Sequence, residues 1–217
     1  MIEQSTNKKR VVCFLVGFFI LVVIRVFIYN AFDSNIANET VKVIVGHIFR
    51  LFVWVVPVFI YLIFIDRTNP FKFLKLSTSF KKGLLWSLVI VAVGAIWQIF
   101  EILFRGDIIG HISFISILSL IIVPLFEEIV MRGFVLNKLA EFMSFTKALF
   151  ISAGFFLLIH LPGWFLITPV KPIGQMLIDS IAVFIIVGLA GGILMKKSNS
   201  LYPSITLHLI NNFISSV

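Results

Sequence analysis

Charged side chains are scarce in this chain. Of its 217 residues 13% are charged and 60% are hydrophobic, whereas about a quarter of the residues of a soluble domain are charged. This shortage excludes an ordinary water-soluble domain, a disordered chain and a coiled coil, and it predicts an integral membrane protein. The formal net charge of +8 is spread among apolar segments. We therefore predict no nucleic-acid partner and expect the basic side chains to face anionic lipid of the bilayer.

Cysteine and the motifs of several hydrolase classes are also missing. Cys13 is the single cysteine, so an intramolecular disulfide, a Cys-rich zinc site and an iron–sulfur cluster are excluded. The sequence contains neither His-Glu-x-x-His nor Gly-x-Ser-x-Gly, which excludes a zinc protease of the first type and a serine nucleophile of the second. Asp179 has no second intramembrane Asp as a partner, which argues against an aspartyl mechanism.

Seven apolar runs are long enough to cross a membrane, since a spanning helix needs about 20 mostly apolar residues. They predict an all-α, polytopic membrane helix bundle of about seven transmembrane helices, or eight if the apolar segment 163–170 re-enters the membrane. The alternative for that segment is an interfacial loop anchored by Trp164. No long linker is visible, so we expect one integral-membrane domain over residues 1–217. The runs cover residues 11–29, 41–65, 83–104, 112–140, 145–160, 173–195 and 201–217.

Basic residues gather in alternate connections between these runs. By the positive-inside rule this pattern places the N-terminus in the cytoplasm and, with seven crossings, the C-terminus outside. The connections on the opposite side are poor in basic residues, with only Arg105 and Lys171. The basic residues that set the orientation are Lys8, Lys9 and Arg10 before the first run, Arg67, Lys72, Lys75, Lys81 and Lys82 after the second, and Lys196 and Lys197 after the sixth.

Two adjacent acids, Glu127 and Glu128, interrupt an apolar run shortly after Pro124. An ionisable group inside a bilayer is costly and is by default a functional hypothesis. Pro124 is expected to kink or restart the helix just before the acids. Glu128 and Arg132 are one turn apart and can neutralise each other, which leaves Glu127, about 100° around the helix, to face another neighbour. Glu128 is then a structural residue and Glu127 a chemically reactive one. The alternative is that both acids lie at a cytosolic helix end with an exposed salt bridge.

Two histidines and an asparagine complete the candidate set. His160 ends an apolar run, and His208 and Asn212 share one face of the last run. Each taken alone fits an interfacial or structural residue, but together with the acids they place polar groups on three separate helices. We interpret the other polar groups within the runs as mainly structural: Arg25, His47, Arg50, Glu101 and Asp179.

This set supports two hydrolytic schemes. Glu127, His160 and His208 could hold a divalent metal such as zinc, which lowers the pKa of a bound water to about 7. Without a metal, Glu127 takes a proton from a water held also by His160, and His208 with Asn212 donates hydrogen bonds to the developing oxyanion. We favour the metal-free scheme slightly, because an Asn side chain suits hydrogen bonding better than zinc ligation.

These residues resemble the motifs of the CAAX-protease and bacteriocin-processing (CPBP, or Abi) family of intramembrane proteases. The motifs are Glu-Glu-x-x-x-Arg at 127–132, Phe-x-x-x-His at 156–160 and His-x-x-x-Asn at 208–212. The likeness covers residues 120–217, whereas residues 1–110 carry no such motif. The resemblance implies that Glu127 activates water, that His160 is its partner, that His208 and Asn212 stabilise the oxyanion, and that Glu128 and Arg132 support them. The family carries the label of metalloprotease, but the sequence permits both the metal scheme and the metal-free scheme.

The leading hypothesis is therefore an intramembrane endopeptidase that cleaves a peptide or protein substrate at the membrane. One alternative is a non-catalytic bacteriocin immunity or regulatory protein on the same scaffold, and another is a small transporter in which Glu127 and the histidines relay protons. Helix lengths lead us to expect a site that opens toward the cytoplasm. The abundance of Phe, Ile, Lys and Asn is typical of an A/T-rich bacterial genome, which suggests a bacterial cell membrane.

Overall fold

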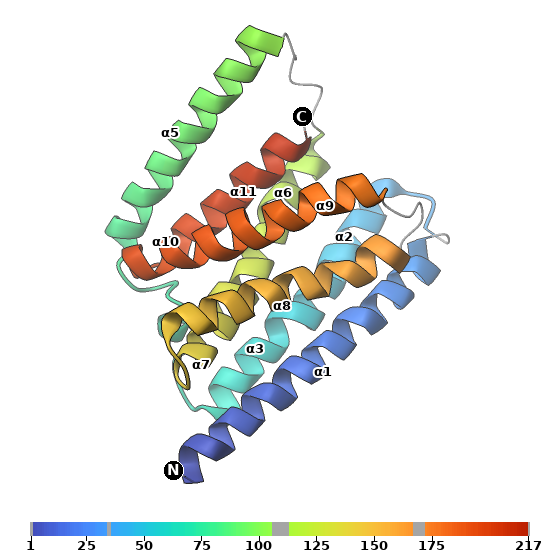
Figure 1. Ribbon diagram of the computed structural model, residues 1–217. Coiled ribbons are helices and arrows are strands. Elements are labelled where there is room, and N and C mark those ends of the chain that lie inside the picture. The colour runs from blue at the N-terminus through green and yellow to red at the C-terminus, as the bar shows by residue number, and fades with distance from the viewer. Residues whose placement is uncertain (1, 34–35, 106–112, 167–171, 217) are drawn as a thin grey trace.

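The protein is described by a computed structural model, which covers residues 2–33, 36–105, 113–166 and 172–216. Within these residues every regular element is helical (Figure 1). Several elements follow one another without a break and form longer rods, in which π-helical segments (η) alternate with α-helix. The elements are α1 (Ile2–Asp33), α2 (Glu39–Arg50), η1 (Leu51–Val55), α3 (Val56–Ile60), η2 (Tyr61–Ile65), α4 (Pro70–Phe73), α5 (Phe80–Arg105), α6 (Phe114–Glu128), η3 (Ile129–Leu136), α7 (Asn137–Ala140), α8 (Phe145–Leu166), α9 (Ile173–Ile181), η4 (Ala182–Ala190), α10 (Gly191–Ser198) and α11 (Tyr202–Ser216).

Six rods among the described residues are long and apolar enough to cross a membrane, which confirms an all-α polytopic bundle. Each coincides with a predicted run. The seventh run forms α11, whose 15 residues span about 22 Å, less than the roughly 30 Å of a hydrocarbon core. Segment 163–170 is helical as far as Leu166, and its remaining residues lie outside the described ones. The six rods are Lys8–Ala31, Glu39–Ile65, Phe80–Phe104, Phe114–Ala140, Phe145–Leu166 and Ile173–Ser198.

The rod that carries the two acids changes its helix type at them. α6 continues through Pro124, and the π-helix η3 begins at Ile129, directly after Glu128. The helix therefore does not restart before the acids, and it changes its type directly after them. Since a proline lacks an amide hydrogen, the carbonyl of Leu120 loses its intrahelical partner. A π-helical turn inside an α-helical rod frequently accompanies a functional site, because it shifts the direction of the following side chains.

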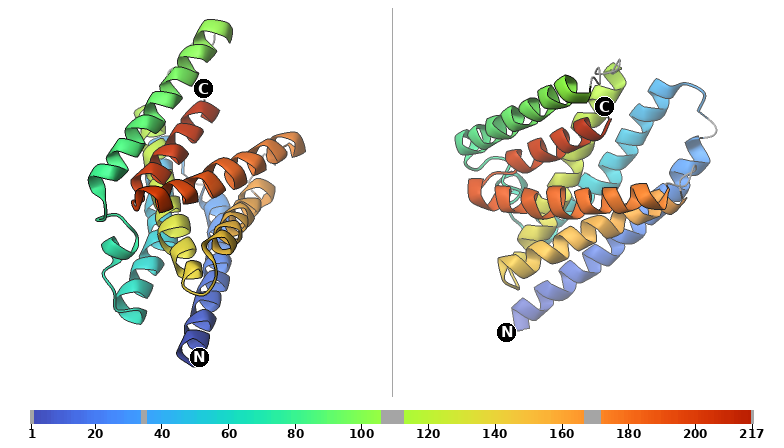
Figure 2. Two further views of the ribbon diagram at one scale, coloured as in Figure 1. Left: turned by 60° about the vertical axis from the view of Figure 1, so that its left-hand side comes forward. Right: turned by 45° about the horizontal axis from the view of Figure 1, so that its top comes forward.

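The buried apolar core fills one half of the bundle. It includes Phe134 of η3, whose ring lies 4.7 Å from that of Phe14 and 5.1 Å from that of Tyr61. Phe18 of α1 meets Trp54 of η1 edge to face at 5.5 Å. These contacts join α1, the second rod and η3. They lie close to the end of the bundle that carries the N-terminus, and Figure 2 shows the ribbon of this end from two further directions. Side chains leave little free space in this half.

Small residues bring the sixth rod close to its neighbours. A Cβ atom on Gly188 would lie 2.8 Å from the Cβ of Ala153 in α8, and one on Gly191 would lie 2.6 Å from Ser204 Oγ in α11. Both distances are too short for real carbon contacts, so these helices pack at glycine-limited separation, as small residues allow in membranes. This packing draws α8 and α11 together around the sixth rod.

Helix α5 lies along α11 at the edge of the bundle and exposes most of its apolar side chains (Figure 1). Leu103 and Phe104 are among the most exposed of them. In water such a surface would be unfavourable, whereas in a bilayer it faces acyl chains. The exposed apolar surface therefore supports the assignment of an integral, multi-pass membrane protein.

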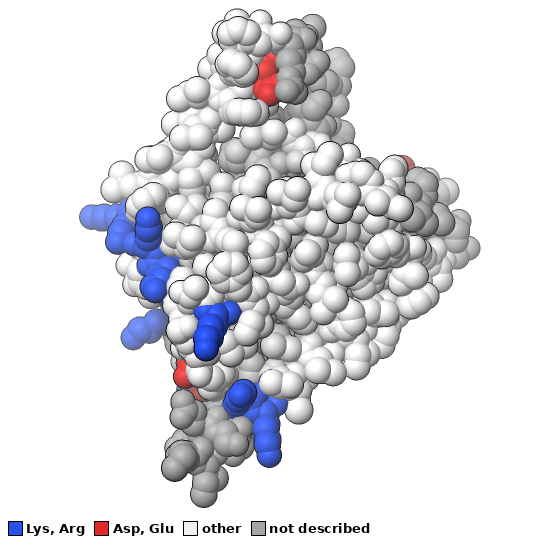
Figure 3. Space-filling view, in the orientation of Figure 1, with Lys and Arg blue, Asp and Glu red and all other residues white. Residues whose placement is uncertain are grey.

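Lys and Arg side chains gather at the end of the molecule that holds the N-terminus (Figure 3). We call this end the basic end; it carries Lys8, Lys9 and Arg10, the connection between η2 and α5, and Lys196 and Lys197. Two members of the predicted sparse side, Arg105 and Lys171, have side chains outside the described residues. The separation of charge agrees with the pattern from which a cytoplasmic N-terminus is expected.

Single-cysteine labelling tests this orientation. In a Cys13→Ser background, which removes the one native cysteine, we expect a membrane-impermeant maleimide added to sealed cells to label Ser215→Cys. Ser77→Cys, an exposed position at the basic end, should react only after the cells are permeabilised. The reverse pattern would contradict a cytoplasmic basic end.

Candidate active site

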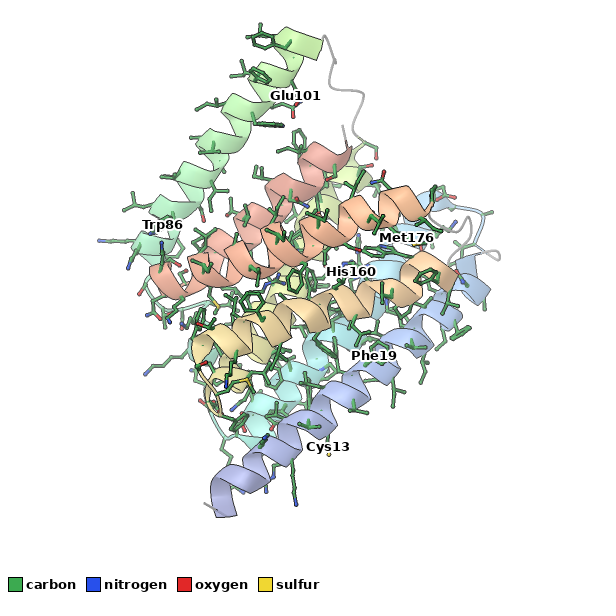
Figure 4. All side chains as sticks on the ribbon, viewed as in Figure 1. Cys13, Phe19, Trp86, Glu101, His160 and Met176 are labelled. Atoms are coloured by element: carbon green, nitrogen blue, oxygen red, sulfur yellow. The ribbon has the colours of Figure 1, made fainter. Side chains whose placement is uncertain are left out.

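Four helical segments contribute polar side chains to one region near the middle of the bundle. Glu127 and Glu128 end α6, His160 lies in α8, His208 in α11, and Arg50 ends α2. His160 is labelled in Figure 4 and lies in the interior of the bundle. The predicted site residues therefore come together from separate helices, although 81 positions separate Glu127 from His208 in the sequence.

Glu128 is fully engaged by its neighbours. Its Oε1 lies 3.0 Å from Arg132 Nη1 and 3.0 Å from His208 Nδ1, and its Oε2 accepts a short hydrogen bond from the Ser204 hydroxyl. The side chains of Glu128 and Arg132 are 0% and 1% exposed. The geometry confirms the predicted pairing of these two residues and excludes the alternative of a surface salt bridge at a helix end. A buried pair of this kind persists only with further hydrogen bonds to the carboxylate, which Ser204 and His208 supply.

Phe156 connects the histidines to Arg132. Its ring meets the His160 ring edge to face at 4.6 Å and the His208 ring at 5.8 Å. The Arg132 guanidinium lies over the same ring, 4.3 Å from its centroid, which is a favourable cation–π distance. Neither Nη atom of Arg132 makes a directed hydrogen bond, so the ion pair and the Phe156 ring are what stabilise this buried charge. The phenylalanine of the Phe-x-x-x-His motif thus has a packing role inside the site.

Glu127 faces away from Glu128 toward both histidines. Its Oε2 lies 3.8 Å from His160 Nε2 and 3.8 Å from His208 Nε2, and its Oε1 lies 3.4 Å from Arg50 Nη1. The carboxylate is 6% exposed. A separation of 3.8 Å is too long for a direct hydrogen bond and suits groups that share a bridging water. Glu127 therefore faces a different set of neighbours, as the helical spacing predicts.

The second ring nitrogen of each histidine has its own partner. His160 Nδ1 lies 2.7 Å from the Phe156 carbonyl oxygen, which can only accept, so Nδ1 carries the proton and donates. His208 Nδ1 likewise donates to the Glu128 carboxylate at 3.0 Å. A neutral carbonyl stabilises a neutral imidazole, whereas a carboxylate also stabilises an imidazolium. The two histidines thus differ in the partner of Nδ1, a backbone carbonyl for His160 and a carboxylate for His208.

A cavity of about 790 Å³ extends from these groups. Glu127, His160, His208 and Asn212 all line it, so the fourth predicted catalytic residue shares the same space. Its other polar lining side chains are Arg50, Ser116, Ser119, Trp164, Gln175, Asp179, Asn211 and Ser215.

The cavity extends away from the basic end. Beyond the site residues, its lining includes the first half of α6, the second half of α11 and the start of α9, together with Val43 of α2 and residues between 182 and 187 of η4. For this cavity, the expectation of a cytoplasmic opening and the expectation of a cytoplasmic basic end do not both hold. The physical reason is packing, because the apolar core of Phe134, Met131 and Leu136 fills the bundle on the other side of the acids.

One protein family matches the chain, over residues 109–214: type II CAAX prenyl endopeptidase Rce1-like. The match includes all three motifs and confirms the resemblance to CAAX-type intramembrane proteases that the sequence predicts. No curated protein and no solved structure matches the chain. The match supports an intramembrane endopeptidase in general, and it leaves α1 to α5 outside the matched region.

Arg50, which precedes the Rce1-like region, is the site residue that sequence reasoning misses. The sequence interpretation treats it as mainly structural because it is one of several single, scattered polar groups, yet its Nη1 lies 3.4 Å from Glu127 Oε1. No local signal identifies it, since 77 positions separate the two residues. Trp164 also approaches the site, with its ring 5.7 Å from that of His160. Of the other residues treated as structural, Asp179 lines the large cavity and His47 hydrogen-bonds Ser119 at 2.9 Å.

The metal scheme requires a set of side chains in the site that are placed to bind a metal ion. Among the described residues, no group of three or more His, Cys, Asp or Glu side chains has the arrangement to hold a metal ion. The guanidinium of Arg50 also lies against Glu127, where its positive charge opposes a divalent cation. The side chains in this arrangement do not fit a divalent metal ion, and the proposed mechanism uses none.

Substitution of each acid separates their structural contributions. We expect Glu128→Gln to lower the free energy of unfolding by about 3 kcal/mol or more, because it leaves the buried Arg132 without its counter-ion. Glu127→Gln is the matched control at the adjacent position, and it should cost less, since the partners of Glu127 are all 3.4 Å or more away. Unfolding in mixed detergent micelles measures both. An equal loss in the two variants would contradict the assignment of Glu128 as the scaffold.

Proposed function

We propose that this chain is an intramembrane endopeptidase that hydrolyses a peptide bond with a water activated by Glu127. The observation that carries the proposal is the position of Glu127 Oε2, 3.8 Å from the Nε2 atoms of both His160 and His208. That spacing accommodates one water between a carboxylate and two imidazoles. The family match supports endopeptidase activity in general, and the roles below go beyond it.

His160 orients the water. Because its Nδ1 proton is donated to the Phe156 carbonyl, a neutral His160 presents a lone pair on Nε2. The water donates one hydrogen to this lone pair and the other to Glu127 Oε2, which directs its own lone pairs at the substrate carbonyl carbon. Arg50 holds Oε1, so that Oε2 is the oxygen turned toward the histidines. Glu127 then accepts the proton as the oxygen attacks, which is general-base catalysis.

His208 stabilises the product of attack. Glu128 beside Nδ1 orients the His208 ring so that Nε2 faces Glu127, and a protonated ring donates its Nε2–H to the oxyanion of the tetrahedral intermediate. Asn212 lines the same cavity and supplies an amide donor to that oxygen. Preorganised donors of this kind account for a large part of catalysis in acyl transfer. The proton taken by Glu127 is finally given to the leaving amine, so no covalent intermediate and no external acid are needed.

The shape of the cavity favours hydrolysis over transport. A proton relay requires a path from one side of the membrane to the other, but the buried Met131, Phe134 and Leu136 fill the bundle between the acids and the basic end. The large cavity serves one side only. With the basic end in the cytoplasm, the peptide segment reaches Glu127 from outside, in a membrane that the composition suggests is bacterial.

The proposal is tested by cleavage of a peptide library in detergent, with products identified by mass spectrometry. We expect Glu127→Gln to reduce the hydrolysis rate by about 100-fold or more, because the general base is lost. Glu39→Gln, an exposed glutamate at 80% exposure, is the matched control and should retain the rate. His208→Gln should also lose activity, since it removes the imidazole proposed to donate to the oxyanion. Full activity in folded Glu127→Gln protein would contradict the proposed role of Glu127.

A further inference from the structure

A second cavity, of about 320 Å³, lies between α1, the junction of α2 with η1, and α8. These helices lie side by side in the views of Figures 1 and 2. The cavity adjoins the large one at Glu127, Arg50, His160 and Trp164, which line both. Its remaining lining belongs to α1, η1 and α8, and the proposed hydrolysis uses none of it.

Three N–H donors around this cavity have no acceptor among the described residues. Arg25 Nε, Arg50 Nε and Trp54 Nε1 are buried and make no hydrogen bond there, and all three residues line the cavity. Buried donors without acceptors are rare and costly in folded proteins. A ligand with several acceptor oxygens would satisfy these donors together, because they surround one space.

The charge of the cavity favours an anion. Its lining holds two guanidinium groups, those of Arg25 and Arg50, and one carboxylate, that of Glu127. Arg50 pairs with Glu127 at 3.4 Å. No carboxylate of the described residues forms an ion pair with Arg25, whose guanidinium lies 5.8 Å from the Tyr29 ring centroid. One positive charge is left over in a low-dielectric interior, where an anion is a stronger partner than water.

The cavity lies near the membrane surface opposite the basic end. α1 starts at the basic end and α8 starts beside Lys196, so the last residues of both helices lie at the other end. The two helix ends meet where Asn30 Nδ2 donates to the Leu166 carbonyl oxygen at 2.7 Å. Arg25 precedes Asn30 by five residues, or about 7.5 Å of helix, which an arginine side chain can span to reach the lipid headgroups. Trp164 lies two residues before Leu166, a position typical of an interfacial tryptophan.

Apolar side chains complete the cavity and its rim. Val22 and Val26 of α1 and Ile159 of α8 line it beside the arginines. The neighbouring Ile24 and Phe27 of α1 are 45% and 57% exposed, so in a bilayer they face acyl chains. The lining thus combines a cationic part with an apolar part that borders lipid, and this combination fits an amphipathic anion better than an inorganic one.

We propose that Arg25, Arg50 and Trp54 bind the phosphate of a phospholipid from the leaflet opposite the basic end. The phosphate oxygens accept hydrogen bonds from the three donors and supply an anionic partner for the Arg25 guanidinium. The bound lipid fills the space between α1 and α8, which leaves the large cavity as the route of water and peptide to Glu127. Lipid binding does not require hydrolysis, so this site is independent of the proposed function.

Native mass spectrometry in lipid-free maltoside tests the site by titration with dioleoylphosphatidylglycerol and with dioleoylglycerol, which has the same chains without the phosphate. We expect the tightest dissociation constant of the phospholipid to lie at least about 10-fold below that of dioleoylglycerol. Arg25→Gln should weaken phospholipid binding by about 10-fold because it removes the charge, and Trp54→Phe, which keeps an apolar ring but removes the N–H, by about fivefold. Arg10→Gln in the same helix and Trp97→Phe in α5 are matched controls outside the cavity, and both should bind as the wild type does.

Other results of this titration would overturn the site. Equal binding of the two lipids, or an equal loss in Arg25→Gln and Arg10→Gln, would show that basic side chains attract phospholipid without a defined cavity site. Displacement of the phospholipid by an excess of inorganic phosphate at constant ionic strength would assign the cavity to a free anion instead. A protein that binds the phospholipid as expected but cleaves no peptide would support the site and overturn the proposed function. A protein that cleaves peptide but has no preference for the phosphate would overturn the site while the hydrolase stands.

Discussion

The buried ion pair between Glu128 and Arg132 is the interaction on which the rest of the site depends. It lies where α6 passes into the π-helix η3, and through Ser204 and His208 it joins this rod to α11. Charges this deeply buried are tolerated only when every partner is in place, so the pair fixes the relative position of the two rods. It also engages one of the two adjacent carboxylates, that of Glu128, in fixed contacts. The other, Glu127, is turned toward the histidines because neighbouring residues on a helix project about 100° apart.

The bundle divides into a packed half and an open half around this ion pair. Toward the basic end, aromatic and aliphatic side chains such as Phe134, Phe18 and Tyr61 fill the interior. Toward the opposite end, the first half of α6 and the second half of α11 line a cavity of about 790 Å³. The polar groups around Glu127 therefore adjoin open space on one side and packed side chains on the other. This asymmetry is what links the packing of the N-terminal rods to the chemistry of the Rce1-like region.

The sequence predicts those features that depend on local spacing. The apolar runs are continuous and long, so the six spans follow from hydropathy, and the four-residue spacing of Glu128 and Arg132 correctly predicts their pairing. The three motifs also predict that Glu127, His160 and His208 converge. Arg50 could not be predicted in the same way, because it reaches Glu127 only through the packing of α2 against α6. Helix length likewise says nothing about which half of the bundle is filled, so it does not indicate that the cavity extends away from the basic end.

The central claim is that one glutamate is a scaffold and its neighbour a reagent, and a double-mutant cycle on unfolding tests it most directly. Arg132→Met is combined with Glu128→Gln and, separately, with Glu127→Gln, and the free energy of unfolding is measured for each single and double variant. The account predicts a coupling of at least about 2 kcal/mol between Glu128 and Arg132, because loss of both charges costs less than the sum of the two single losses. It predicts near-additive losses for Glu127 and Arg132. Additive losses for the Glu128 pair, or an equal coupling for both glutamates, would contradict it.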